Sequence, residues 1–82
     1  VLFEGNEAFA VVPVKFMRDL NVDHSKVNVN GGAIALGHPT GASGSRIMAH
    51  LAYELRRTGK RYGLGSACIG GGQGVAIIIE SV

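Results

Sequence analysis

Two segments of the chain place their apolar residues along one side of a helix. In the first, from Glu7 to Leu20, apolar residues recur every three or four positions, and Asn6 precedes them as a helix cap. Pro13 lies inside this segment, where proline removes one backbone hydrogen bond and crowds the preceding turn. We therefore expect either a kink at Pro13 or a helix that effectively begins later.

The second helical segment has a clearer pattern. It begins at Ser43 or Ser45, both good helix caps, and Gly59 supplies the left-handed residue that ends it. Its apolar positions are Ile47, Met48, Leu51, Ala52 and Leu55. Its polar positions, predicted on the opposite face, are Arg46, His50, Glu54 and Arg57. This amphipathic pattern predicts that one face of the helix packs on the protein core.

Between the helices, the pattern predicts a short strand. Val27 to Val29 follows the polar loop Asn21 to Lys26 and leads into Gly31-Gly32 and the apolar stretch Ala33 to Leu36. We interpret this region as a strand that runs into a glycine loop.

Two further strands are predicted after the second helix, Tyr62 to Cys68 and Val75 to Ile79, joined by the loop Ile69 to Gln73. The order is helix, strand, helix, strand, strand, so the predicted fold class is α/β with an α-β-α-β-β arrangement. The last strand is continuously apolar, and we expect both of its faces to be buried.

Composition limits the range of functions. The 82 residues fit one small unit, and 12 of the 13 glycines fall between Gly31 and Gly74, an excess that points to tight loops. A net charge of +2 is too small to indicate a nucleic-acid partner. Four of the eight cations lie together at the end of the second helix, which indicates either a solvated helix end or a patch that attracts an anion. These are Arg56, Arg57, Lys60 and Arg61.

The same composition gives expectations about location. A single cysteine cannot form an internal disulfide, which favours a reducing cytoplasm. The apolar runs are too short and interrupted to span a bilayer, so we expect no membrane partner. The chain does not begin with Met and starts with no targeting segment, which suggests a fragment of a longer protein.

Candidate reactive groups lie in three loops. Asn6 and Glu7 form the first, and His38, between Gly37 and Pro39, is presented on a tight glycine-lined turn in the second. For His38 a structural role and a functional role are equally supported at this point. In the third loop, Cys68 precedes the glycines from Gly70 to Gly72, whose backbone amides can approach an oxyanion closely.

Cys68 itself allows two interpretations. A lone cysteine is most often buried and inert, but a neighbouring His38 would favour thiol chemistry. Nucleotide binding is weakly supported, because the glycine loops lack the Gly-Lys-Ser/Thr ending of a P-loop and do not open a helix as a dinucleotide fingerprint does. The His and Cys spacings match no metal site, so we expect none.

Three motifs together resemble those of the thiolase family. Asn28 to Gly44 (NVNGGAIALGHPTGASG) resembles its histidine loop, and Gly63 to Gly74 (GLGSACIGGGQG) resembles its C-terminal cysteine motif. Asn6 to Phe9 (NEAF) resembles its asparagine motif. The resemblance covers nearly the whole chain and implies the last part of a thiolase C-terminal domain, without the N-terminal half that carries the nucleophilic cysteine.

The resemblance implies reversible transfer between acyl-CoA and 3-ketoacyl-CoA, by thiolysis or Claisen condensation, with no metal or redox cofactor. Implied partners are acyl-CoA, 3-ketoacyl-CoA, coenzyme A and the rest of the thiolase subunit, in a homo-oligomer, either dimer or tetramer. His38 would deprotonate the nucleophile and help to stabilise the enolate oxygen, and Asn6 would hold a water that donates to the same oxygen. Cys68 would act as acid and base at the α-carbon, and the Gly70 N–H would contribute to an oxyanion hole.

Two function hypotheses follow. The chain is either a catalytic C-terminal part of a thiolase, inactive by itself, or a non-catalytic thiolase-like protein that binds or carries lipid or acyl-CoA. The presence of Asn6, His38 and Cys68 favours the first hypothesis. A cysteine nucleophile upstream in the reading frame would decide between them.

Overall fold

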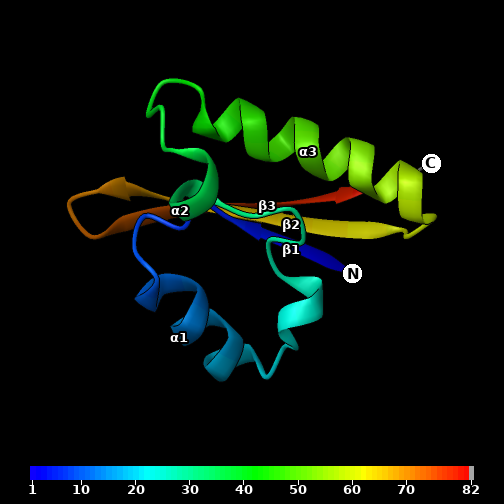
Figure 1. The fold of residues 1–82 in the computed structure, drawn as a ribbon, viewed down its shortest axis with the longest axis horizontal. Helices are drawn as coiled ribbons and strands as arrows, with labels where there is room; N and C mark the ends of the chain where they lie inside the picture. Colours follow the sequence, from blue (N-terminus) through cyan, green and yellow to red (C-terminus); the bar gives the residue numbers. More distant parts are fainter. Residues whose placement is uncertain (82) are drawn as a thin grey trace.

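A three-stranded sheet flanked by helices forms the centre of the molecule (Figure 1). The computed structural model describes residues 1–81. The strands are β1 (Leu2–Gly5), β2 (Tyr62–Gly70) and β3 (Gln73–Glu80). The helices are α1 (Val11–Leu20), α2 (Ala33–Leu36) and α3 (Ser43–Thr58), with a 3-10 turn η1 (His24–Lys26). The predicted α/β class is therefore confirmed.

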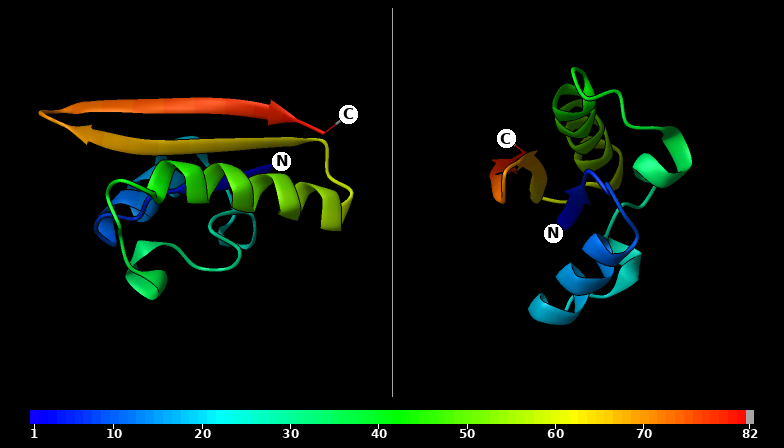
Figure 2. Two further views of the ribbon diagram at one scale, coloured as in Figure 1. Left: turned by 90° about the horizontal axis from the view of Figure 1, so that it is seen from above. Right: turned by 90° about the vertical axis from the view of Figure 1, so that its left-hand side faces the viewer.

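The sheet has the order β1-β2-β3 and lies between two helical layers. β1 pairs in parallel with β2, and β2 pairs antiparallel with β3. Figure 2 shows α3 on one face and α1 on the other. On the α1 side, the rings of Phe3 and Phe16 meet edge to face with centroids 5.4 Å apart.

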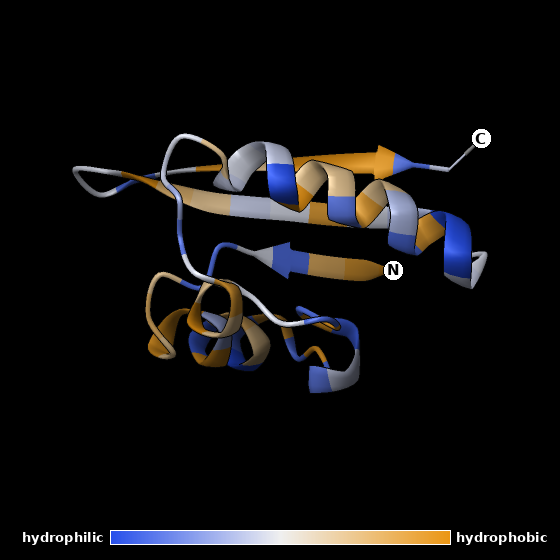
Figure 3. Ribbon diagram, turned by 45° about the horizontal axis from the view of Figure 1, so that its top comes forward, coloured by the Kyte–Doolittle hydropathy of each residue, from blue (hydrophilic) through white to orange (hydrophobic). Residues whose placement is uncertain are grey.

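The core lies between α3 and the first two strands. Its buried apolar side chains are Leu2, Ile47, Leu51 and Leu55. Figure 3 shows the apolar side of α3 against the sheet. A Cβ on Gly63 would lie 3.1 Å from Leu51 Cδ2, and one on Gly65 would lie 3.1 Å from Ile47 Cγ2. The absence of side chains at these two positions of β2 therefore lets α3 approach the sheet closely.

Two predictions at the start of the chain need correction. The pattern did not predict β1, which is only four residues long and contains the charged Glu4. The first helix begins at Val11 rather than Glu7, and Asn6 does not cap it, because the cap position is Ala10. Pro13 therefore lies in the first turn, where backbone N–H groups have no helical partner, so the expectation of a later start is correct.

The predicted strand Val27 to Val29 is reduced to a single bridge between Phe3 and Val27. Asn28 has a φ of 46°, and this left-handed conformation ends the extended segment. After the Gly31-Gly32 pair, the apolar stretch Ala33–Leu36 forms the short helix α2.

The last two strands are longer than predicted and differently buried. β2 and β3 extend to a tight turn at Gly71 and Gly72. β3 lies at the edge of the sheet, and Ile79 is its one residue packed against the core. The prediction that both faces of β3 are buried is therefore wrong for the described residues, because α3 packs against β1 and β2.

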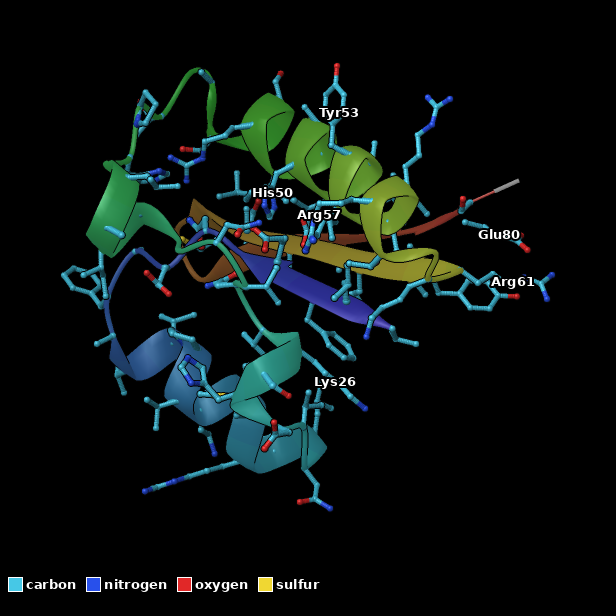
Figure 4. All side chains as sticks on the ribbon, turned by 45° about the vertical axis from the view of Figure 1, so that its right-hand side comes forward. Lys26, His50, Tyr53, Arg57, Arg61 and Glu80 are labelled. Atoms are coloured by element: carbon cyan, nitrogen blue, oxygen red, sulfur yellow. The ribbon has the colours of Figure 1, made fainter. Side chains whose placement is uncertain are left out.

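Two of the four clustered cations have acidic partners. Arg57 pairs with Glu54, and Arg61 pairs with Glu80 at 2.6 Å while lying over the ring of Tyr62. Figure 4 shows Arg61 and Glu80 close to each other, near the end of β3. This pairing favours a solvated helix end over an anion-binding patch. None of the helices described over residues 1–81 is long and apolar enough to cross a membrane.

Candidate active site

The four residues singled out from the three motifs lie around one cleft. The cleft has a volume of about 420 Å³, and Asn6, His38, Cys68 and Gly70 all line it. Asn6 follows β1, His38 follows α2, and the other two lie in the last part of β2. Segments distant in the sequence are therefore brought together at one end of the sheet.

Asn6 and Cys68 are in direct contact. Asn6 is 2% exposed, and its Nδ2 donates to Cys68 Sγ at 3.4 Å. The Cys68 side chain is exposed, so the thiol is not an inert core residue in the described chain. A bulge between Cys68 and Gly70 interrupts the pairing with β3, and bulges redirect the side chains next to them.

The glycines after Cys68 form an open, glycine-specific turn, and Gly70 lines the cleft. Gly70, Gly71 and Gly72 all have positive φ, between 59° and 110°. A Cβ built on any of them would meet nothing within 4 Å. The space that a side chain would occupy is therefore open for a ligand atom to approach the backbone.

His38 is held by a serine whose role the sequence did not reveal. His38 Nδ1 lies 2.6 Å from Ser43 Oγ, and Ser43 Oγ donates to the carbonyl oxygen of Pro39 at 3.1 Å. The sequence suggested Ser43 as a helix cap, but the cap position of α3 is Ala42, with no side-chain cap hydrogen bond. Ser43 is instead buried beside the imidazole.

Glu7 connects the asparagine motif to the histidine loop. Its Oε2 accepts from Asn28 Nδ2 at 2.9 Å, and its Oε1 accepts from the backbone N–H of Ile34 at 3.3 Å. A Cβ on Gly32 would lie 2.8 Å from Glu7, so only glycine leaves room for this side chain. Glu7 thus ties the segment after β1 to α2, the helix that leads into His38.

A second polar cluster lies beside the core and was not predicted. Glu4 is 6% exposed, and its Oε1 lies 3.3 Å from His50 Nδ1. Asn30 Nδ2 lies 2.7 Å from His50 Nε2 and donates to Glu54 Oε2 at 3.1 Å. In Figure 4 His50 and Arg57 lie on the side of α3 that faces β1. Glu54 is therefore buried, contrary to its predicted place on the exposed face.

Burial and charge shift two carboxyl groups of this cluster in opposite directions. Burial raises the pKa of Glu4 to about 7, although the nearby Arg46 guanidinium works against this shift. The hydrogen bond from Arg57 lowers the pKa of Glu54. The helical pattern gave no signal for the cluster, because it shows which residues share a face but not which polar groups meet across two elements.

Metal coordination finds no support in the part of the chain that the structure describes. Among residues 1–81, no three His, Cys, Asp or Glu side chains come together as a possible ion site.

Comparison with known proteins gives consistent results. The family model described as "Thiolase, C-terminal domain" matches residues 1–81. The chain is 66% identical to the human protein named mitochondrial 3-ketoacyl-CoA thiolase, over 98% of this chain and 20% of that protein. It is 58% identical to the acetyl-CoA acetyltransferase of Shinella zoogloeoides, over 99% of this chain and 21% of the relative.

A solved structure shares the fold as well as the sequence. The crystal structure of human mitochondrial 3-ketoacyl-CoA thiolase in complex with CoA superposes with a TM-score of 0.94 and 65% identity. The match covers 99% of this chain and 21% of that one, so the chain spans about a fifth of the length of the relatives it matches. The predicted cytoplasmic location is wrong by this comparison, because the human relative is named as a mitochondrial protein. Taken with the cleft and its three motifs, the match over residues 1–81 shows that the chain belongs to the thiolase family.

Proposed function

We propose that this chain supplies the acid–base side of a thiolase active site. The observation that carries the proposal is the single cleft lined by Asn6, His38, Cys68 and Gly70, with Asn6 and Cys68 in contact. The proposed reaction is reversible acyl transfer, in which 3-ketoacyl-CoA and coenzyme A give acetyl-CoA and a shortened acyl-CoA. Similarity to a human thiolase whose structure contains CoA supports coenzyme A thioesters as the substrates.

In the proposed mechanism, each residue either transfers a proton or stabilises a negative charge. His38 takes the thiol proton of the nucleophilic cysteine and later donates a hydrogen bond to the thioester enolate oxygen. Asn6 holds a water that donates to the same oxygen, and Cys68 gives or takes the α-proton of the acetyl group. The Gly70 N–H donates to the oxyanion of the acyl-transfer step. Carbanion chemistry of this kind requires hydrogen-bond donors that are already in place around the oxygen where negative charge develops.

The nucleophile of this reaction is not among these 82 residues. Cys68 is the one cysteine in the sequence, and it occupies the acid–base position. We therefore infer that the chain works as the C-terminal portion of a thiolase C-terminal domain, within a longer subunit of a homo-oligomer. Its matches to mitochondrial relatives support a mitochondrial location. The proposed chemistry uses no metal or redox cofactor.

A chimera tests the proposal. Residues 1–82 replace the matching segment of the human mitochondrial 3-ketoacyl-CoA thiolase, and thiolysis of acetoacetyl-CoA is compared with that of the unmodified human protein. We expect activity within about tenfold of the human protein, a difference of roughly 1.4 kcal/mol in transition-state stabilisation. The 82-residue chain alone should give no turnover above the enzyme-free rate.

Other outcomes have equally clear meanings. A folded chimera that binds coenzyme A but has no thiolysis activity would contradict the proposal and favour a non-catalytic carrier of lipid or acyl-CoA. Turnover by the 82-residue chain alone would show that Cys68 or another group serves as nucleophile, and would contradict the role given to Cys68.

A further inference from the structure

We propose that Ser43 is a positioning residue that keeps the proton of the neutral His38 imidazole on Nδ1 and so leaves Nε2 free to act as the base. The inference rests on the proposed function, because it concerns the base of that reaction. It adds a residue to which neither the family match nor the motif resemblance gives a role.

The argument begins with the protons available around Ser43. A serine hydroxyl has one proton to donate and two lone pairs to accept with. Ser43 Oγ lies 3.1 Å from the carbonyl oxygen of Pro39, which can only accept, and the inference places the hydroxyl proton in this hydrogen bond. With the proton there, His38 Nδ1, which lies 2.6 Å from the same Oγ, is the donor to Ser43. Because a neutral imidazole carries one proton, Nε2 is left unprotonated.

The hydroxyl is not needed to build the turn or the helix. The Pro39 carbonyl also accepts from the backbone N–H groups of Ala42 at 2.8 Å and Ser43 at 2.9 Å, which close this turn by themselves. The start of α3 has no side-chain cap hydrogen bond that would be lost. Ser43 is 3% exposed, so water does not readily replace it beside the imidazole. Removal of the hydroxyl should therefore affect His38 first.

The consequence for proton transfer is direct. In the neutral ring, the Nε2 lone pair accepts the thiol proton of the nucleophile, which becomes a thiolate. The imidazolium then has a proton on each nitrogen, and its Nδ1–H continues to donate to Ser43 Oγ. With the other tautomer, Nε2 already carries a proton and cannot accept one.

The experiment uses the thiolase chimera, in which these 82 residues belong to a full-length subunit. Ser43→Ala removes the hydroxyl, Ser43→Thr keeps it, and Ser45→Ala removes a nearby exposed hydroxyl of the same helix as the matched control. Two properties are measured: kcat and KM for thiolysis of acetoacetyl-CoA, and the ¹⁵N chemical shifts of the His38 ring nitrogens. The His38 signals are assigned by their loss in His38→Asn.

In metal sites, loss of the hydrogen-bond partner that orients a histidine typically lowers affinity or activity roughly 10- to 100-fold. By analogy, we expect kcat of Ser43→Ala to fall in that range with KM unchanged. Its ¹⁵N shifts should move away from the Nδ1–H tautomer. Ser43→Thr and Ser45→Ala should keep both the rate and the shifts of the unsubstituted chimera.

Three results would overturn the inference: a Ser43→Ala variant with unchanged kcat, one with lower kcat but an unchanged tautomer, or a Ser43→Thr variant as impaired as Ser43→Ala. A chimera that is inactive before any substitution would contradict the proposed function instead. The ¹⁵N shifts of that chimera and of its Ser43→Ala variant would still decide whether Ser43 sets the tautomer.

Discussion

The contact between Asn6 and Cys68 defines the candidate site at the scale of single residues. Asn6 Nδ2 donates to Cys68 Sγ at 3.4 Å, and His38 lines the same cleft. An amide, an imidazole and a thiol around one cleft give the site groups that can orient water, take a proton and exchange a proton at carbon. The three groups should therefore be separable by their effects on different steps.

Substitution in the chimera should separate these steps. His38→Ala should reduce both acyl-enzyme formation and exchange of the acetyl α-protons with solvent, since the proposed function gives His38 a role in both half-reactions. Cys68→Ala should leave the acylation burst comparatively intact and abolish deuterium exchange at the acetyl methyl group. Loss of one oxyanion donor typically lowers the rate about 10²- to 10³-fold. Asn6→Ala should lower the rate by that much or less, because Asn6 is proposed to act only through a water.

The comparison of the two signals is decisive for Cys68. Burst-phase acylation and methyl deuterium exchange are measured on the same preparations. Equal loss of both signals in Cys68→Ala would mean that Cys68 only supports the shape of the cleft.

Glu4 gives a prediction about pH. Its pKa is raised by burial from 4.5 to about 7, so between these values the folded protein binds more protons than the unfolded chain. The free energy of unfolding should therefore fall as pH rises through this window. Glu4→Gln, which resembles the protonated acid, should be more stable than the unsubstituted chimera at pH 8 by roughly 1–3 kcal/mol.

The midpoint of thermal unfolding from pH 4.5 to 8 measures this difference. The advantage of Glu4→Gln should shrink toward the acid end of the range. Asp19→Asn changes an exposed carboxylate on α1 and should show no comparable pH dependence. A constant difference between Glu4→Gln and the unsubstituted protein would contradict the raised pKa.

At the scale of elements, the close contact of α3 with β2 holds the sheet and the site together. α3 begins at Ser43 beside His38, and its apolar residues rest on the positions of β2 that lack side chains. Gly63→Ala should force Leu51 and Leu55 apart and cost roughly 1–3 kcal/mol of stability, the usual effect of overpacking. Gly44, in the first turn of α3, has open space around it.

Gly44→Ala is therefore the matched control for Gly63→Ala. Alanine at a compatible helical position stabilises by roughly 0.5–1 kcal/mol relative to glycine. Chemical denaturation of both variants of the chimera should give free energies of unfolding that change in opposite directions. A neutral Gly63→Ala would show that α3 does not depend on this close approach.

The same elements show what the sequence can and cannot reveal. α3 and the β2–β3 hairpin were predictable, because a 3.6-residue apolar repeat and a β-branched run between glycines are strong local signals. β1 was not, because four residues with a charged Glu4 among them give no period. The partner of Glu4, His50, lies on another element, 3.3 Å away. Ser43 was assigned to a helix cap because a serine can either cap a helix or hydrogen-bond a neighbouring side chain. Only the position of His38 in the structure distinguishes these two roles.

At the scale of the whole molecule, β3 leaves an apolar edge. Val75, Ile77 and Ile78 are 55%, 49% and 68% exposed, and small domains bury only about 60–65% of their unfolded surface. Unpaired edge strands of this kind pair with other chains. The 82-residue chain alone should therefore associate, exchange strands or fold only marginally.

Sedimentation velocity at micromolar concentration measures this association. Ile78→Lys places a charge on the edge strand and should reduce association, because charged residues block edge pairing. Val1→Lys adds the same charge at an exposed position away from β3 and serves as the control. A monodisperse monomer that melts cooperatively would contradict the prediction.

The parallel pairing of β1 with β2 also determines when the site can form during protein synthesis. Asn6 is made sixty-two residues before Cys68, and within these 82 residues the sheet partner of β1 is β2, which is made much later. Formation of a parallel pair between strands far apart in the sequence is slow, and an unpaired strand can aggregate before its partner is available. We therefore expect the nascent chain to need protection by chaperones over this interval, so that the cleft forms late in translation or after it.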